Sequence, residues 1–545
     1  MGHLPLPMYK TTHILTLGWF VLAVAGLLAT AGAYGQAHQA ALQIYPVQTI
    51  YPHSDNFALS VNGQSIPVTS FRQYDIAQFA LGRGEARISI SRNDGSTIKS
   101  AHISPRKLNL SGEISEQRLI FTIHSPDFLI VKVDSLPELV LAIDPLPANV
   151  PHPSGKGIFN ISDADYGAVA GKDYSTDGFQ RALNDASKWG TRQAGKDKGT
   201  VYVPAGLWTV GSLYLSSNTN LYLAPGAVLR FTGEASHYKV DGRKDSQERD
   251  LTWFISTRPN SENISITGRG TIDGNGRESL KVSNLGVNLL APVQTKHFAV
   301  DGITFRESSS WGVIPTRSHD VSFTDIKIFN GLDMGEDDGI DIVESSDVLI
   351  QNAIAIALDD PFSTKTWQAD TDMFKAVLGK PQPLQHVRIE HVIAWTRCYG
   401  LKVGQGIVHP QNDITFDDAT VYDAAVGFGI HHKWGSSSAT NITFRNIDVE
   451  HLCCTNDNNR TWMALWMANT PGPQPIDHVT ISNIHIWDAG STPARINGMA
   501  GSPITRVKLE NIFMPGDSSP ATTLPAMHIT DDTFHDTITI NPMDH

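Results

Sequence analysis

The sequence has few cysteines and few charged residues, and each of these low counts excludes some classes of protein. Three cysteines in 545 residues, Cys398, Cys453 and Cys454, are too few for a disulfide scaffold, and an odd number cannot all pair within the chain. Charged residues make up 18% of the chain, against about 25% in an average globular protein. With 41% hydrophobic residues, this composition argues against a disordered chain or a coiled coil and favours a folded protein rich in β structure.

The charge balance excludes two classes of partner. Lysine and arginine number 42 against 55 aspartates and glutamates, which gives a formal net charge of -13, and no basic run interrupts the chain. Nucleic acids and anionic membranes are therefore not expected partners. No set of cysteines and histidines has the spacing of a zinc site, so we expect neither a metal nor another cofactor.

Only one long hydrophobic run is present, from Ile14 to Ala33. Lys10 precedes it, and Ala31-Gly32-Ala33 ends it. A basic start, an apolar centre and a small-residue exit predict a secretory signal peptide over residues 1–33. The alternative is an uncleaved anchor, because the run approaches the length of a bilayer-spanning helix. We expect a secreted or periplasmic protein.

Residues 38–147 have the pattern of a small antiparallel β-sandwich. Apolar and polar residues alternate over short runs such as Ala86–Ser91, Leu119–Ile123 and Phe128–Val133, with turn signals between them. Such alternation indicates sheets that each bury one face. Prolines 145, 147, 151 and 153 then predict a stiff linker and a domain boundary.

Residues 158–545 have a different, repetitive pattern. One helix is predicted, over Asp177–Lys188, and short strand-like units then recur about 20 to 40 residues apart, as solenoid coils do. The units open at Ile264, Phe298, Val321, Val348, Val387, Ile414, Ile442, Val479 and Val507. A large β-sandwich is the alternative, but an asparagine stands before several units, as at Asn263, Asn441 and Asn483. The pattern thus favours an all-β chain whose second part is a right-handed parallel β-helix.

Several segments of this second region resemble the polygalacturonase-type glycoside hydrolases. They are Asp165-Tyr-Gly-Ala-Val169, Gly199-Thr-Val-Tyr-Val-Pro-Ala-Gly206 and Ile266-Thr-Gly-Arg-Gly-Thr-Ile-Asp-Gly274. The resemblance spans roughly residues 159–507 and implies a β-helix rather than a particular reaction, since β-helix lyases share such segments. A β domain ahead of the helix is instead similar to dextranases and isopullulanases.

The chemistry is carried by two acidic motifs. Glu336-Asp-Asp-Gly-Ile-Asp341 resembles the Asn-Thr-Asp-Gly-x-Asp motif of polygalacturonases, and Asp359-Asp360 follow about one coil later. Stacked strands lie about 4.8 Å apart, so coils would bring these carboxylates together, and crowding would give them unequal proton affinities. The resemblance implies that Asp359 is the general acid, and that Asp338 and Asp360 activate water in an inverting reaction. A turn, a solvated face or a calcium site is the alternative for such a cluster.

Substrate contacts are expected around these motifs, with departures from the family pattern. Tyr399 stands where polygalacturonases have histidine, and His431 stands at the position of the arginine that binds uronate carboxylates. Histidine cannot reproduce the planar fork of arginine, so a neutral sugar becomes a candidate. The expected substrate-binding residues are Lys365, Tyr399, Lys402, His431, His432 and Lys433.

Taken together, these motifs predict an exported glycoside hydrolase that cleaves O-glycosidic bonds of a polysaccharide or its oligomers and is polygalacturonase-like. A dextranase-like or isopullulanase-like α-glucan hydrolase is the alternative within the hydrolases. A polysaccharide lyase or a noncatalytic glycan-binding β-helix is the alternative from another class.

Overall fold

The computed structural model describes residues 39–172, 174–367, 375–453, 460–468, 475–536 and 538–541. The predicted signal peptide, residues 1–33, and Cys454 lie outside the described residues. Within these ranges, no helix combines the length and apolar character needed to cross a bilayer.

Two sheets form the N-terminal β-sandwich. One contains β1 (Leu42–Ile44), β4 (Thr69–Phe71), β5 (Tyr74–Leu81), β7 (Ala101–Ser104), β10 (Phe128–Val133) and β11 (Glu138–Pro145). The other contains β2 (Phe57–Val61), β3 (Gln64–Ile66), β6 (Ala86–Arg92), β8 (Glu113–Ser115) and β9 (Arg118–Ile123). Alternate residues such as Leu59, Ile88 and Phe121 fill the core between the sheets, as the alternation predicted. The strands pair antiparallel except β5 and β11, which pair parallel.

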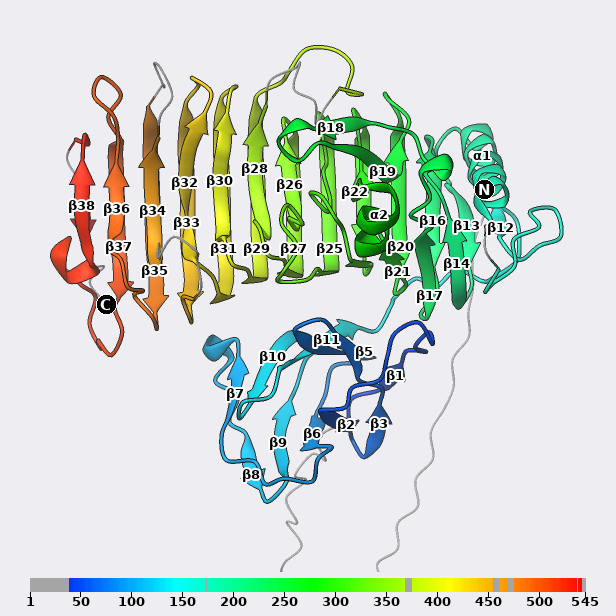
Figure 1. Ribbon diagram of the computed structural model, residues 1–545, viewed down its shortest axis with the longest axis horizontal. Helices are drawn as coiled ribbons and strands as arrows, with labels where there is room; N and C mark the ends of the chain where they lie inside the picture. The colour runs from blue at the N-terminus through cyan, green and yellow to red at the C-terminus, as the bar shows by residue number, and fades with distance from the viewer. Residues whose placement is uncertain are drawn as a thin grey trace, which may run out of the picture. The chain divides into compact units, whose positions relative to one another are not determined.

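The remainder of the chain is a right-handed parallel β-helix. Its described part contains a 17-stranded sheet, which we call the long sheet. The strands are β12 (Ile158–Asn160), β13 (Gly199–Val203), β14 (Gly206–Val210), β16 (Thr219–Leu223), β17 (Ala227–Phe231), β20 (Glu262–Gly268), β21 (Thr271–Asp273), β23 (Lys296–Asp301), β24 (Thr304–Arg306), β25 (His319–Phe329), β27 (Ser346–Ile356), β29 (Leu384–Trp395), β31 (Gln411–Asp423), β33 (Ala439–Val449), β35 (Ile476–Ile486), β37 (Thr505–Phe513) and β39 (Thr539–Asn541). Figure 1 shows its successive strands side by side.

The opposite wall of the β-helix is built in two stretches. The first is a four-stranded sheet of β15 (Leu213–Leu215), β18 (Gly242–Lys244), β19 (Arg249–Thr257) and β22 (Leu285–Ala291). The second, which we call the site sheet, has seven described strands: β26 (Ile340–Val343), β28 (Phe362–Thr366), β30 (Tyr399–Ile407), β32 (Val426–Trp434), β34 (Thr461–Met467), β36 (Ala494–Asn497) and β38 (Ile529–Thr533). Val313 bridges Leu290 to Ile340, so the two stretches are continuous.

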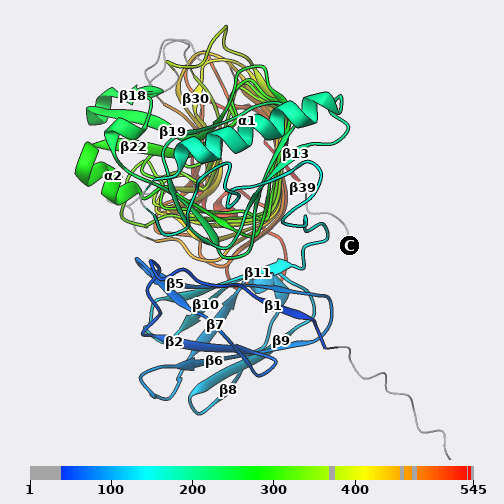
Figure 2. The ribbon, with the colours of Figure 1, turned by 90° about the vertical axis from the view of Figure 1, so that its right-hand side faces the viewer.

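Two α-helices are described. Helix α1 (Thr176–Arg192) contains the predicted helix and buries Phe179 and Leu183 in the core at the first coils. Figure 2 shows α1 lying across that end of the stacked coils. Helix α2 (Gly276–Ser283) lies between β21 and β22 and was not predicted.

The strand register confirms the predicted repeat. Ile264, Phe298, Val321, Val348, Val387, Ile414, Ile442, Val479 and Val507 pair each with the next along the long sheet. Like residues stack because each coil repeats the local geometry of the coil before it. The asparagines ahead of the units adopt positive φ, 57° at Asn263 and 56° at Asn441, a conformation that asparagine tolerates better than most residues.

The β-sandwich contacts the long sheet through a shared core. Phe71, Tyr74 and Ile130 of the sandwich cluster with Phe329 and Trp395 of the β-helix. The Tyr74 hydroxyl donates to the carbonyl of Asn330 over 2.9 Å. The sandwich strands end at Pro145 and the β-helix strands begin at Ile158, while the assignment of 38–147 and 158–545 as separate domains stays a prediction.

Candidate active site

The two acidic motifs enter neighbouring strands of the site sheet at equivalent points. Ile340 of β26 pairs with Phe362 of β28, and Gly339 donates its backbone N–H to the carbonyl of Asp360 over 3.0 Å. Continuing this register back by two residues places Asp338 and Asp360 at the same position of consecutive coils. The predicted approach of the two motifs is therefore produced by the stacking.

Lys365, on β28, holds several of these carboxylates. Its Nζ lies 2.7 Å from Asp338 Oδ2, 2.6 Å from Asp341 Oδ1 and 3.8 Å from Asp360 Oδ2. Burial, followed by repulsion from Asp341, raises the pKa of Asp338 well above its usual range despite the ammonium. The pKa of Asp341 is also raised, chiefly by burial, so Lys365 does not offset the burial of these two carboxyls.

Asp360 is kept ionised by a second lysine. Lys402, on β30, places its Nζ 2.7 Å from Asp360 Oδ2, and both side chains are buried. Burial opposes ionisation of Asp360, but Lys402 and then Lys365 outweigh it and lower the pKa of this carboxyl. The result is a carboxylate that stays charged near neutral pH.

The pKa of Asp359, the residue before Asp360 in the chain, is shifted in the opposite direction. Burial and repulsion from Asp360 raise the pKa of Asp359, although its side chain is partly exposed. The backbone N–H of Asp360 donates to Asp359 Oδ1 over 3.1 Å, which orients the carboxyl. Adjacent residues with a raised and a lowered pKa provide one proton donor and one proton acceptor.

Several buried carboxylate oxygens have no hydrogen-bond partner within the described part of the chain. They are Asp338 Oδ1, Asp341 Oδ2, Asp360 Oδ1 and Asp337 Oδ2. Buried acceptors without a donor are rare and costly. A water or another hydrogen-bond donor would satisfy them.

Trp311 and its neighbours flank the carboxylates toward the earlier coils. The Nζ of Lys365 lies 3.9 Å from the centroid of the Trp311 ring. The Trp311 indole N–H donates to Glu336 Oε2 over 3.2 Å, and Lys244 Nζ lies 2.9 Å from the same oxygen. Glu336 replaces the asparagine of the family motif and here forms an ion pair.

A row of rings lies toward the later coils. Tyr399 stacks on His431 with centroids 5.9 Å apart, and His431 stacks on Trp466 at 4.6 Å. Arg495, in the coil after Trp466, places the carbon of its guanidinium 5.4 Å from the centroid of the Trp466 ring. Burial, then the charge of Lys402, lowers the pKa of His431 to about 3, so this imidazole is neutral at working pH.

Two of the predicted contacts have other partners. His432 is buried, and its Nε2 lies 2.7 Å from the carbonyl oxygen of Ser437. Lys433 is half-buried, and its Nζ lies 5.2 Å from the Trp434 ring. Substrate roles for these two residues, as for the rest of the predicted site, stay predictions.

Sequence reasoning missed Trp311 and Trp466. Both lie in coils without an acidic motif, so no local pattern singled them out. Only the register that places Trp466 beside His431 could have indicated its position.

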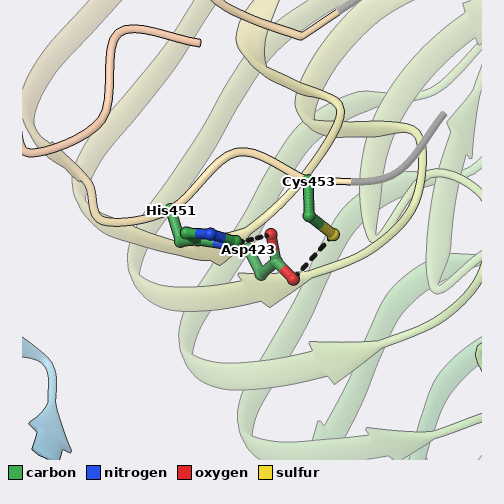
Figure 3. Close-up of side chains that lie close together, drawn as sticks. All are labelled: Asp423, His451 and Cys453. Carbon is green, nitrogen blue, oxygen red and sulfur yellow. Dashed lines mark hydrogen bonds and ion pairs between the residues drawn. The ribbon is translucent and has the colours of Figure 1, made fainter. Parts of the chain in front are cut away.

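In the described residues, two groups of side chains have donor atoms close enough together to hold a metal ion. One, Asp359, Asp360 and Cys398, belongs to the acidic site. The other joins Asp423, His451 and Cys453 (Figure 3): Asp423 Oδ1 lies 2.9 Å from His451 Nδ1, and Cys453 Sγ donates to Asp423 Oδ2 over 2.9 Å. The Arg397 guanidinium donates to both Asp423 and Cys453, so a cation already contacts this group. Within the described residues, Cys398 forms no disulfide.

A parallel β-helix that holds carboxyls of unequal proton affinity at one site is suited to acid–base cleavage of glycosidic bonds. The family model for glycosyl hydrolases family 28 matches residues 196–530, and the chain belongs to this family. It is therefore a glycoside hydrolase of polygalacturonase-like type.

Similar proteins agree with this assignment. A Vitis vinifera protein named "Probable polygalacturonase" is 23% identical over 380 residues, 65% of this chain and 74% of its own length. The polygalacturonase structure from Erwinia carotovora has a TM-score of 0.50 at 17% identity, covering 73% of this chain and 99% of that one. Dex49A from Penicillium minioluteum has a TM-score of 0.51 at 13% identity, covering 92% of this chain and 96% of that one. At these identities the two structures support the fold alone.

Proposed function

We propose that the protein hydrolyses O-glycosidic bonds of a galacturonate-containing polysaccharide or its oligomers, with inversion at the anomeric carbon. Asp359 protonates the leaving oxygen, Asp360 deprotonates the attacking water, and Asp338 helps to position that water. The observation that carries this proposal is the opposite shift of two adjacent carboxyls, with the pKa of Asp359 raised and that of Asp360 lowered.

The roles follow from where protons reside before the reaction. Burial and repulsion from Asp360 favour the protonated form of Asp359, whose side chain is partly exposed, where a leaving oxygen can reach it. The lowered pKa of Asp360 keeps this carboxyl ionised, and its Oδ1, like that of Asp338, has no hydrogen-bond partner among the described residues. Asp338 and Asp360 stand at the same position of consecutive coils, and Lys365 and Lys402 act as positioning residues that set the charge of the acids.

Membership of the glycosyl hydrolase family favours hydrolysis over the lyase and noncatalytic alternatives. The relative from Vitis vinifera is named a polygalacturonase, which supports a galacturonate-containing substrate. We also propose export, on the pattern of residues 1–33, as expected of an enzyme whose substrate is an extracellular polymer.

One observation favours a second candidate, a neutral-sugar substrate of the dextranase type. Lys365 and Lys402, both expected to bind substrate, are already paired with buried carboxylates, and His431 is neutral. A uronate carboxylate placed beside these groups would meet existing negative charge. The β-sandwich ahead of the β-helix points in the same direction.

The test is product analysis over polygalacturonate, pectic oligomers, dextran and pullulan, with the anomeric configuration followed by NMR. We expect reducing ends from polygalacturonate that are inverted when first released. Release from dextran alone would establish the second candidate, and retained configuration would refute the assigned roles.

The Asp359→Asn variant tests the proposed acid. It should remain folded and lose about 10²- to 10⁴-fold in kcat, the usual contribution of general acid catalysis. Asp347→Asn is the matched control, because Asp347 is an exposed carboxyl of β27 that pairs with histidines away from the site. Equal rates for Asp359→Asn and the parent would remove Asp359 from the mechanism.

A further inference from the structure

The outer face of the long sheet has a hollow of about 670 Å³. Its floor lies over β16 and β20, and residues 145–149 of the linker and 196–198 ahead of β13 border it. None of the residues that line it belongs to the acidic site, which lies on the site sheet. We call this feature the linker hollow.

The floor of the linker hollow is a patch of oriented polar groups. Asn220 of β16 pairs in register with Ser265 of β20, and Thr267 lies two residues further on the same face. Ser265 and Thr267 donate their hydroxyls to Asn220 Oδ1 over 2.9 and 3.0 Å. These bonds fix the amide, and no described residue accepts a hydrogen bond from Asn220 Nδ2.

Lys198 adds a cation without a partner. It is half-buried on the lining of the hollow and forms no ion pair or hydrogen bond with any residue in the described ranges. Burial alone lowers the pKa of its ammonium. A partly desolvated charge without a counter-ion is unfavourable, so this position suits an incoming anion.

Lys196, Asp197 and Arg269 also line the hollow, and Arg269, unlike Lys198, has ion-pair partners. It pairs with Asp301 over 2.7 Å and with Asp325 over 3.3 Å, so its charge is already balanced. The hollow therefore offers an anion position at Lys198, beside donors and hydroxyls that match sugar hydroxyl groups.

We propose that the linker hollow is a second, noncatalytic binding site for an acidic oligosaccharide. A uronate carboxylate pairs with Lys198, and the sugar hydroxyls bond to Asn220, Ser265 and Thr267. This site would hold a polymer chain on the face of the β-helix opposite the site sheet. The proposal is independent of the substrate cleaved at the acidic site, because it concerns binding alone.

The test is isothermal titration calorimetry of the full chain carrying Asp359→Asn, with a galacturonic acid tetramer as the probe. Lys198→Met should weaken one binding event at least tenfold, and Asn220→Asp, which adds a repelling carboxylate of the same size, should do the same. Lys188→Met is the control, because Lys188 is an exposed lysine that pairs with Asp185 on α1. In the Asp359-containing protein, Lys198→Met should leave kcat/KM on short oligomers unchanged.

The results distinguish an acidic-oligosaccharide site from a neutral-sugar site, a simple anion site and no binding site. Isotherms that are identical for the parent, Lys198→Met and Asn220→Asp, with melting temperatures showing both variants folded, would overturn the proposal. Equal binding of a neutral glucose tetramer at this site would overturn the acidic class. Inorganic phosphate that binds there and is not displaced by the tetramer would show a simple anion site and would also overturn it.

Discussion

Removing the ammonium of Lys402 should convert Asp360 from a base into an acid. Lys402→Met keeps the length of the side chain but removes the ammonium that lies 2.7 Å from Asp360. The nearest remaining ammonium is then that of Lys365, whose Nζ lies 3.8 Å from Asp360. Burial, the largest influence on Asp360, then acts with less opposition, and the pKa of this carboxyl rises.

The size of the rise follows from the geometry of the pair. An opposite charge at this range lowers a carboxyl pKa by about 1 to 3 units, so its removal should raise the pKa of Asp360 by a similar amount. That change corresponds to about 1.4 to 4 kcal/mol in the stability of the ionised form. At pH values below the new pKa, the base is protonated, and kcat/KM should fall about tenfold for each unit of pH.

The assay is kcat/KM against pH on the substrate identified from the glycan panel. The acidic limb of the Lys402→Met profile should move to higher pH while the rate partly recovers on the alkaline side, which a merely misfolded variant would not do. Lys188→Met, at an exposed pair, should reproduce the parent profile. An acidic limb that stays in place would show that Lys402 does not set the charge of Asp360.

Three further predictions concern protons and buried charge. The parent enzyme should show a bell-shaped kcat/KM profile, because activity is lost at low pH as Asp360 gains a proton and at high pH as Asp359 loses one; a single limb would contradict the pair. Asp337 is buried, and burial raises its pKa well above the usual range. The free energy of unfolding should therefore fall as the pH rises above about 4, the pKa of an aspartate in the unfolded chain. Urea unfolding of Asp337→Asn should show a smaller fall over the same pH range. Lys327→Met should lower the free energy of unfolding by about 3 to 5 kcal/mol, because it leaves Asp144 buried without the ammonium that now lies 2.6 Å away. The double variant Lys327→Met with Asp144→Leu should recover part of that loss. If the losses of the two single variants simply added in the double variant, the two side chains would not stabilise each other.

The architecture was readable from the sequence because its signals are local. Each coil carries its own strand pattern and its own turn asparagine, so the nine opening residues from Ile264 to Val507 could be aligned without coordinates. The helix over α1 was equally visible, since its apolar spacing lies within one segment. The parallel pairing of β5 with β11 was not visible, because partners so far apart in the chain leave no local signal.

The acidic motifs were likewise readable, but their charge states were not. A run such as Asp359-Asp360 identifies two carboxyls without telling which one keeps its proton. That difference depends on Lys402, which reaches Asp360 from the next strand, and on Lys365, which reaches Asp338 from the strand beside it.

Residue order alone was enough to specify a β-helix with acids at recurring positions, because periodicity and turn preference are properties of neighbouring residues. Stacking of coils decided which of those acids favours its protonated form and which stays ionised, and it also left Lys198, on the opposite face, without a counter-ion among the described residues. Both outcomes depend on burial and on distances between strands, and these exist only once the chain has folded.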